Sequence, residues 1–269
     1  TPEQADKISI STNSQSAVKA RDLRSNDKSV LSMKHAYEQY YPDGYFITKR
    51  GEWVDTVRYN SARVVNLTDL GKQLIAWHSQ RPTISYSETK IFDKYFDQLF
   101  HREYSPANIQ ALNVMFAAVY SKWTKENPMG LNDTLLAMKA YAPYHQLYTI
   151  SVIFCEINKM NDSVPSPSVA LQKMTESSLL DYVVDTSGNI LNMAMDNASA
   201  ETTDSGKIFV PQNWVKSKSS LKDIRNAART LLGSLKMYPA GKEALTKLNI
   251  GLSICLLYTS PSPRDLSTS

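Results

Sequence analysis

The chain has 269 residues and a mass of 30.2 kDa, which corresponds to one large domain or two small ones. Apolar residues make up 42% of the sequence, enough to build a hydrophobic core, and this excludes a wholly disordered protein. Only 9 residues are glycine, which disfavours glycine-rich repeats and all-β folds with many turns. The formal net charge of +4 permits an anionic partner without requiring one. Because the sequence contains no secretory signal pattern and no run of about 18 apolar residues, we expect a cytoplasmic protein with no membrane partner.

Both ends of the sequence have unusual patterns. Thr1-Pro2-Glu3 has the pattern of a helix start, so we interpret the sequence as entering within a longer protein. Residues 255–269 resemble a translated transposase-type sequencing adaptor, and the competing interpretation is a natural tail rich in proline and serine. We exclude that segment from functional reasoning. Cys155 is then the single cysteine, and we interpret it as a small buried hydrophobic residue in a reducing compartment.

The first part of the sequence, to about residue 82, mixes helical and extended patterns. Asn26 and Asp27 are expected to cap a helix, and Thr68 and Asp69 to cap another, because these side chains accept hydrogen bonds from the free N–H groups of a first turn. Pro42-Asp43-Gly44 predicts a turn. The predicted elements are helices over 2–12, from Asn26-Asp27 to about Tyr41 and from Thr68-Asp69 to Arg81-Pro82, and short strands over 45–48 and 63–66.

Beyond residue 82 a 3.6-residue hydrophobic period dominates and predicts a helical array. The predicted helices cover 87–100, a long helix from Ser105-Pro106, a helix from Asn132-Asp133 that Pro143 divides from an apolar helix reaching Met160, and then 168–184, 188–200 and 217–236, with a polar loop over 198–207. The predicted fold class is therefore mainly α, a helical array with a small α/β portion at the N-terminal end. We expect boundaries that divide the chain into 1–104, 105–252 and an artefactual or disordered tail over 253–269.

Several segments carry a resemblance to a known family. Residues 12–27, which read TNSQSAVKARDLRSND, resemble a block of the AIPR (abortive infection phage resistance) proteins. Lys49-Arg50-Gly51-Glu52 resembles the family's KRGE element after a strand, and Arg63-Val64-Val65 with the helix after it resembles the next family element. Residues 209–216, FVPQNWVK, are similar to a tryptophan-bearing segment of longer members. The resemblance covers residues 1–125 well and the remainder loosely.

The resemblance implies a C-terminal piece of a bacterial antiphage protein, often encoded near restriction–modification genes. Polar segments that usually precede these elements in the family have no counterpart here, so the chemistry of the full protein is expected in a part that this sequence lacks. We leave open whether the protein is an enzyme.

The basic residues of the family-like block predict a nucleic-acid-binding surface. Arginine and amide side chains are the groups that hold phosphates and read base edges, and Lys49 and Arg50 extend the surface if the strands fold back onto the block. The predicted nucleic-acid-binding residues are Asn13, Gln15, Lys19, Arg21, Arg24, Lys49 and Arg50. The competing interpretation is an internal network in which Asp22 and Asp27 pair with Arg21 and Arg24.

A second basic feature follows the helical spacing of residues 217–236. Lys218, Lys222, Arg225 and Arg229 are expected on one helix face, opposite an apolar stripe. Phosphate contact is one interpretation of this face, and a solvated outer face of a packed helix is the other.

Patterns typical of catalysis are incomplete. His35, His78, His101 and His145 are too widely spread for metal-ligand spacing, so no metal and no cofactor is predicted. Glu88-Thr89-Lys90 matches the short E-x-K of many metal nucleases, but one such tripeptide is expected by chance in a chain of this length. We therefore predict a nucleic-acid-associated module of antiphage defence that binds DNA or RNA. The alternative is a protein–protein scaffold with other defence or restriction–modification proteins as partners, favoured by the near-neutral charge and the aromatic-rich helices.

Overall fold

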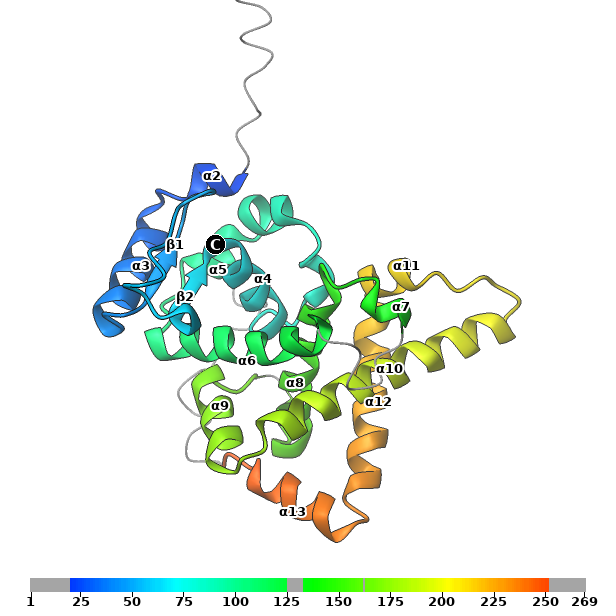
Figure 1. Cartoon of the computed structure of the whole chain (residues 1–269). Helices are drawn as coiled ribbons and strands as arrows, with labels where there is room; N and C mark the ends of the chain where they lie inside the picture. Colours follow the sequence, from blue (N-terminus) through cyan, green and yellow to red (C-terminus); the bar gives the residue numbers. More distant parts are fainter. Residues whose placement is uncertain (1–19, 125–132, 162, 252–269) are drawn as a thin grey trace, which may run out of the picture.

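The computed structural model describes residues 20–124, 133–161 and 163–251 (Figure 1). These residues are mainly helical and contain one small two-stranded sheet, which confirms the predicted fold class. The predicted helix over 2–12 and the adaptor-like segment over 255–269 lie outside the described residues.

The N-terminal part surrounds the sheet at one end of the molecule (Figure 1). Its elements are α2 (Ala20–Arg24), α3 (Lys28–Tyr40), β1 (Tyr45–Ile47), η1 (Ser61–Arg63), β2 (Val64–Asn66) and α4 (Leu67–Trp77). As predicted, Asp27 caps α3, because its carboxylate accepts a hydrogen bond from the Ser29 N–H at 2.9 Å. The predicted cap of α4 was wrong by two residues. Asn66 caps that helix by accepting the Thr68 N–H at 2.9 Å.

The two strands pair in parallel, with Phe46 opposite Val65, and side chains from flanking helices bind the outer edges. On the β1 side, Lys34 donates to the Phe46 carbonyl at 2.7 Å and Glu38 accepts the Phe46 N–H at 3.0 Å. On the β2 side, Asn113 donates to the Val64 carbonyl at 3.3 Å. Helix side chains therefore bond the outward-facing Phe46 N–H and carbonyl of β1 and the Val64 carbonyl of β2.

The rest of the described chain is a helical array. Its elements are η2 (Pro82–Ile84), η3 (Lys90–Lys94), α5 (Phe96–Phe100), α6 (Pro106–Thr124), α7 (Asp133–Leu136), α8 (Ala142–Asn158), α9 (Pro167–Glu176), α10 (Leu180–Asp204), α11 (Pro211–Lys216), α12 (Ser219–Leu235) and α13 (Pro239–Lys247). The predicted helix over 87–100 is divided at Tyr95 into a π-helical turn and α5.

The predicted break between residues 184 and 188 was wrong. The chain breaks earlier, at Ser178, whose φ of 54° is left-handed and ends α9. Turn-forming residues near 187 stay helical because Ser187 donates to the Val184 carbonyl at 2.7 Å within α10. α10 then continues to Asp204, through most of the segment predicted as a polar loop.

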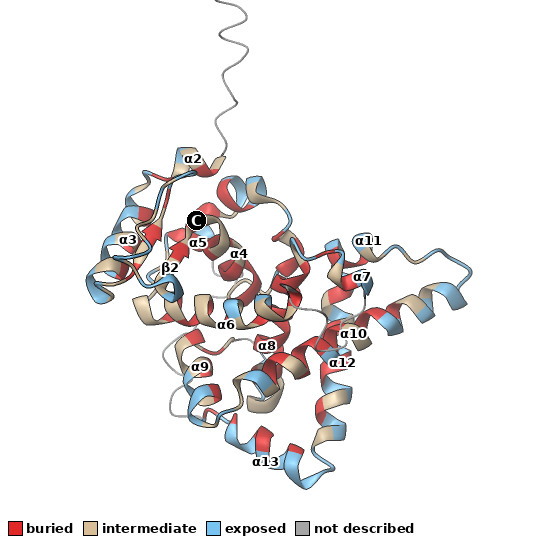
Figure 2. Cartoon of the chain, viewed as in Figure 1, coloured by how far each residue is buried: buried red, intermediate tan, exposed pale blue. Residues whose placement is uncertain are grey.

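Helix α8 is the centre of the core. It packs against α4, α6, α10 and α12, and its residues 142–154 are buried (Figure 2). One buried amide joins three of these helices, because Gln146 accepts the Trp123 indole N–H at 2.6 Å and donates to the Val184 carbonyl at 2.8 Å. Within the described ranges, no helix combines the length and the apolar character needed to cross a membrane.

Candidate functional site

The structure brings the KRGE turn against α2, as the sequence predicts. The Arg50 Nε lies 3.5 Å from the Asp22 carboxylate, and the Arg50 guanidinium also pairs with Glu88. Asn13, Gln15 and Lys19 lie outside the described residues, whereas Lys49 is exposed at the turn. The four described members of the predicted surface thus come from two neighbouring segments, and the charge of Arg50 is shared by two acids.

Arg24 turns toward the interior of the protein. Its Nε donates to the Phe92 carbonyl at 3.3 Å, and its guanidinium carbon lies 4.3 Å from the centroid of the Phe96 ring. Asp27 lies 3.9 Å from the same guanidinium. These contacts favour the internal network over phosphate contact for this residue, and nucleic-acid binding by Arg24 stays a prediction.

Arg21 is buried, with 5% of its surface exposed. Within the described part of the chain, its Nε and one terminal nitrogen have no hydrogen-bond partner. Burial lowers the pKa of Arg21, and the negative charge of Glu88 opposes that effect. This burial favours an interior role for Arg21, and nucleic-acid binding by Arg21 stays a prediction.

Glu52 stabilises the turn that the KRGE element forms. Its carboxylate accepts the N–H groups of Thr48 and Lys49, each at 3.1 Å, and the Tyr45 hydroxyl at 2.5 Å. Burial raises the pKa of Glu52, but these hydrogen bonds outweigh burial and hold the pKa below its usual range. Gly51 has a φ of 68°, a left-handed conformation that favours glycine. The residues of this motif therefore have a structural role in shaping the chain after β1.

Both charged residues of the E-x-K tripeptide contact other side chains in the structure. Glu88 pairs with Arg50, and Lys90 donates to the Tyr86 hydroxyl at 2.9 Å. Over the three described ranges, no group of three or more histidine, cysteine, aspartate or glutamate side chains could hold a metal ion.

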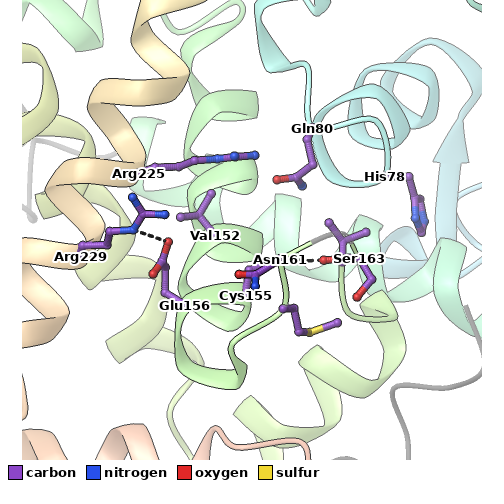
Figure 3. Close-up of a pocket in the computed structure, with 11 residues that line it drawn as sticks. His78, Gln80, Val152, Cys155, Glu156, Asn161, Ser163, Arg225 and Arg229 are labelled. Atoms are coloured by element: carbon purple, nitrogen blue, oxygen red, sulfur yellow. Dashed lines mark hydrogen bonds and ion pairs between the residues drawn. The ribbon is translucent and has the colours of Figure 1, made fainter. Parts of the chain in front are cut away.

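The basic face of α12 divides into two halves. All four residues are exposed, and of the four only Arg225 and Arg229 also bind side chains of α8 within the described residues. The Arg225 Nε donates to the Tyr148 hydroxyl at 2.9 Å. The Arg229 Nε donates to the Glu156 carboxylate at 2.9 Å (Figure 3). Both arginines line a pocket of about 220 Å³. The other lining residues are His78, Gln80, Val152, Cys155, Glu156, Met160, Asn161, Ser163 and Val164.

Cys155 in this pocket is half-buried and donates to the Ser163 carbonyl at 3.6 Å. Burial raises the pKa of its thiol to about 12, although the positive charge of Arg225 acts in the opposite direction. This environment favours the protonated thiol over the nucleophilic thiolate.

A second surface alternates tyrosine rings with cations. The Lys216 ammonium lies 5.2 Å from the ring centroid of Tyr86 and 5.7 Å from that of Tyr141. Tyr95 has the Arg81 guanidinium carbon and the Lys94 ammonium each 5.7 Å from its ring centroid. We call this the tyrosine–cation surface, formed by Arg81, Tyr86, Lys90, Lys94, Tyr95, Tyr141 and Lys216.

Sequence reasoning missed the tyrosine–cation surface. Tyr86 and Lys90 have the i, i+4 spacing that places two side chains together, and Lys94 precedes Tyr95 directly, so two local signals were present. The contact with Lys216 on α11 depends on the packing of α11 against η2, which no local pattern indicates.

Fold and surface together define a mainly helical protein with a small parallel sheet, a cationic surface built on tyrosines and a separate arginine-lined pocket. The family model described as AIPR protein matches residues 2–205. The chain therefore belongs to the AIPR family and is an abortive-infection, phage-resistance protein, which confirms the resemblance seen in the sequence. No curated protein matches the chain, and no solved structure matches it.

Proposed function

We propose that this chain acts in antiphage defence as a nucleic-acid-binding module, and that the tyrosine–cation surface makes the contact. The observation that carries the proposal is the position of Lys216 between the rings of Tyr86 and Tyr141, at 5.2 and 5.7 Å. Unpaired bases stack on exposed aromatic rings, and neighbouring cations neutralise the phosphates. The arrangement therefore favours single-stranded DNA or RNA over duplex.

The charges of this surface support the proposal. Across the ranges that the structure describes, Arg81, Lys90, Lys94 and Lys216 form no salt bridge, whereas Arg50 binds two acids. A cation that rests against a tyrosine ring keeps its full charge for an incoming phosphate. Tyr86 has 41% of its surface exposed, so a base can approach the part of its ring that the two lysines leave uncovered.

A protein partner is the second candidate, and a separate loop favours it. Trp53 and Val57, between β1 and η1, are 79% and 96% exposed. Exposed tryptophan is typical of contact surfaces for proteins, because burying its ring contributes much of the binding free energy. A scaffold function would use this loop and leave the tyrosine–cation surface free.

Fluorescence anisotropy with labelled single-stranded DNA, single-stranded RNA and duplex DNA tests the proposal. We expect the single strands to bind more tightly, with an affinity that falls steeply as salt rises. Replacing Tyr86 and Lys216 together by alanine removes a stacking ring and a phosphate contact, and is expected to weaken binding about tenfold or more. Lys218→Ala with Lys222→Ala removes two lysines from exposed positions on or next to α12 and is the matched control.

Two results would contradict nucleic-acid binding at this surface. One is affinity that does not change with salt, and the other is an equal loss in the control double variant. Thermal melting of each variant checks that the fold is kept. The double variant Trp53→Ser with Val57→Ser should bind nucleic acid like the wild type, since its positions belong to the other candidate surface.

A further inference from the structure

The pocket between α8, α12 and the segment that follows α4 contains Arg225, which has no acidic partner among the described residues. Within the described residues, Arg225 forms no salt bridge, because the nearby carboxylate of Glu156 binds Arg229. The polar contact of Arg225 is with the uncharged hydroxyl of Tyr148 at 2.9 Å. The thiol of Cys155, which also lines the pocket, is uncharged as well. The pocket thus carries a positive charge that the surrounding side chains do not neutralise.

Arg225 is an exposed residue whose Nε is oriented by a hydrogen bond to α8. Tyr148 is fully buried in α8, so its hydroxyl is a fixed acceptor for the Arg225 Nε. Figure 3 shows the Arg225 side chain extending from α12 across the pocket toward Gln80. With Nε already bonded, the two terminal nitrogens remain to bind a ligand, and their planar fork matches two oxygens of one anion.

The opposite side of the pocket offers an acceptor. The amide nitrogen of Gln80 donates to the Trp77 carbonyl at 2.6 Å and to the Ser151 hydroxyl at 2.8 Å. These two bonds fix the amide, which leaves the Gln80 carbonyl oxygen to accept a hydrogen bond from a ligand hydroxyl or amine. Arg229, one turn along α12 from Arg225, adds a second guanidinium at the same pocket.

We propose that this pocket binds the phosphate group of a small molecule, with Arg225 as the principal phosphate-binding residue and Arg229 as the second. Two guanidinium groups suit the larger, doubly charged phosphate better than a carboxylate. The pocket volume of about 220 Å³ lies below the usual range for drug-sized ligands, so the ligand is no larger than a sugar phosphate or a mononucleotide. The site uses α8, α12 and the segment that follows α4 rather than the tyrosine–cation surface, and it does not depend on the proposed function.

Isothermal titration calorimetry with the full chain tests this site, in a buffer free of phosphate and sulfate. The probes are inorganic phosphate, ribose 5-phosphate and adenosine 5′-monophosphate, with ribose and adenosine as uncharged controls. We expect the phosphorylated probes to bind and the uncharged ones to give no heat. Tighter binding of the sugar phosphate or mononucleotide than of inorganic phosphate identifies a phosphate ester as the ligand, whereas equal affinity identifies the free ion.

Variants of residues on α12 distinguish binding in the pocket from nonspecific attraction to positive charge. Arg225→Gln should weaken binding of the tightest probe about tenfold or more, since it removes a charge-assisted pair of hydrogen bonds. Lys222→Gln removes the same charge from an exposed position on α12 and should change affinity less than about twofold. Glu156→Gln frees Arg229 from its internal carboxylate and should tighten binding several-fold.

The folding control is a thermal melt of each variant. If Arg225→Gln unfolds, Arg225→Lys is used in its place. Lysine keeps the positive charge but cannot donate the paired hydrogen bonds of a guanidinium group, so this variant should still weaken binding. The proposal is overturned if the wild type binds no phosphorylated probe at millimolar concentration. It is equally overturned if Lys222→Gln weakens binding as much as the Arg225 variant.

Discussion

Arg24 lies over the ring of Phe96, with its guanidinium carbon 4.3 Å from the ring centroid, and donates to the carbonyl of Phe92. This arrangement joins α2 to the π-helical turn and α5, which the sequence separates by the whole sheet. An arginine in a motif suited to phosphate contact is thus used to hold the N-terminal helix on the core.

Replacing Arg24 tests that structural role. We expect Arg24→Ala to lower the free energy of unfolding by about 1–2 kcal/mol, because it removes a cation–π contact and a hydrogen bond. Urea unfolding followed by circular dichroism measures the change. Lys28→Ala, at an exposed position in the first turn of α3, is the control and should change stability by less than about 0.5 kcal/mol. Unchanged stability of the Arg24 variant would argue that its side chain is free to bind a partner.

The buried amide of Gln146 also contributes to stability. Gln146→Leu keeps most of the volume but leaves the Trp123 indole N–H without its acceptor, whereas the Val184 carbonyl keeps the Ser187 hydroxyl as a donor. An unsatisfied buried group costs about 1–3 kcal/mol, and we expect a loss of that size in urea unfolding. Adding Trp123→Phe removes the orphaned N–H, so the double variant should lose less than the sum of the single variants. Strict additivity would contradict this account.

The buried His145 is expected to lower the free energy of unfolding in mild acid. Burial lowers its pKa to about 4, although contacts with the carbonyls of Tyr141 and Val215 favour the protonated form. In the unfolded chain the imidazole of His145 has a pKa near 6.5, so it binds a proton at pH values where the folded chain does not. The free energy of unfolding therefore falls as pH drops from about 6.5 toward 4. At pH 5 this residue alone should cost about 2 kcal/mol relative to pH 7.5.

His145→Gln checks the source of that acid sensitivity. Glutamine can donate to the Val215 carbonyl, which His145 contacts at 2.8 Å, and it does not titrate. Unfolding free energies measured at pH 7.5 and 5.0 should therefore differ less in the variant than in the wild type. A remaining pH dependence of similar size is expected from His78, whose pKa burial also lowers to about 4. Identical pH dependence of the two proteins would exclude His145 as the sensor.

Two glycines near the end of the chain should respond to alanine in opposite directions. A Cβ at Gly241 would lie 2.3 Å from the Leu235 carbonyl oxygen, so Gly241→Ala forces α12 and α13 apart and should cost about 1–3 kcal/mol. Gly233 lies inside α12 with open space around it. Gly233→Ala should therefore gain about 0.5–1 kcal/mol by favouring the helix. Differential scanning calorimetry of both variants compares the signs, and a shared sign would contradict this packing.

Local signals predicted much of this fold. Asp27 as a cap, the two short strands and the amphipathic α12 all depend on a few neighbouring residues, and each is found. The continuity of α10 was missed because it depends on Ser187, whose hydroxyl turns back to its own helix and also accepts from Gln146 of α8 at 3.2 Å. At Ser187, packing of α10 against α8 therefore outweighs the local tendency of the sequence to form a turn.

The candidate site was predictable only in part. The approach of Arg50 to α2 follows from strands that fold back, and the sequence indicated it. The orientation of Arg24 depends on its contact with the ring of Phe96 in α5. The tyrosine–cation surface depends on the packing of α11 against η2. Partners that are distant in sequence decide whether an arginine or lysine faces solvent, and single-sequence patterns do not contain that information.

The side chains that bind the edges of the sheet also protect the protein from self-association. An uncovered strand edge recruits a strand from another molecule, which is a route to aggregation. Here Glu38 accepts the Phe46 N–H, Lys34 donates to the Phe46 carbonyl and Asn113 donates to the Val64 carbonyl. These backbone groups are therefore already bonded and unavailable to an incoming strand. A chain in which α3 or α6 lost these contacts would present unbonded strand edges to other molecules.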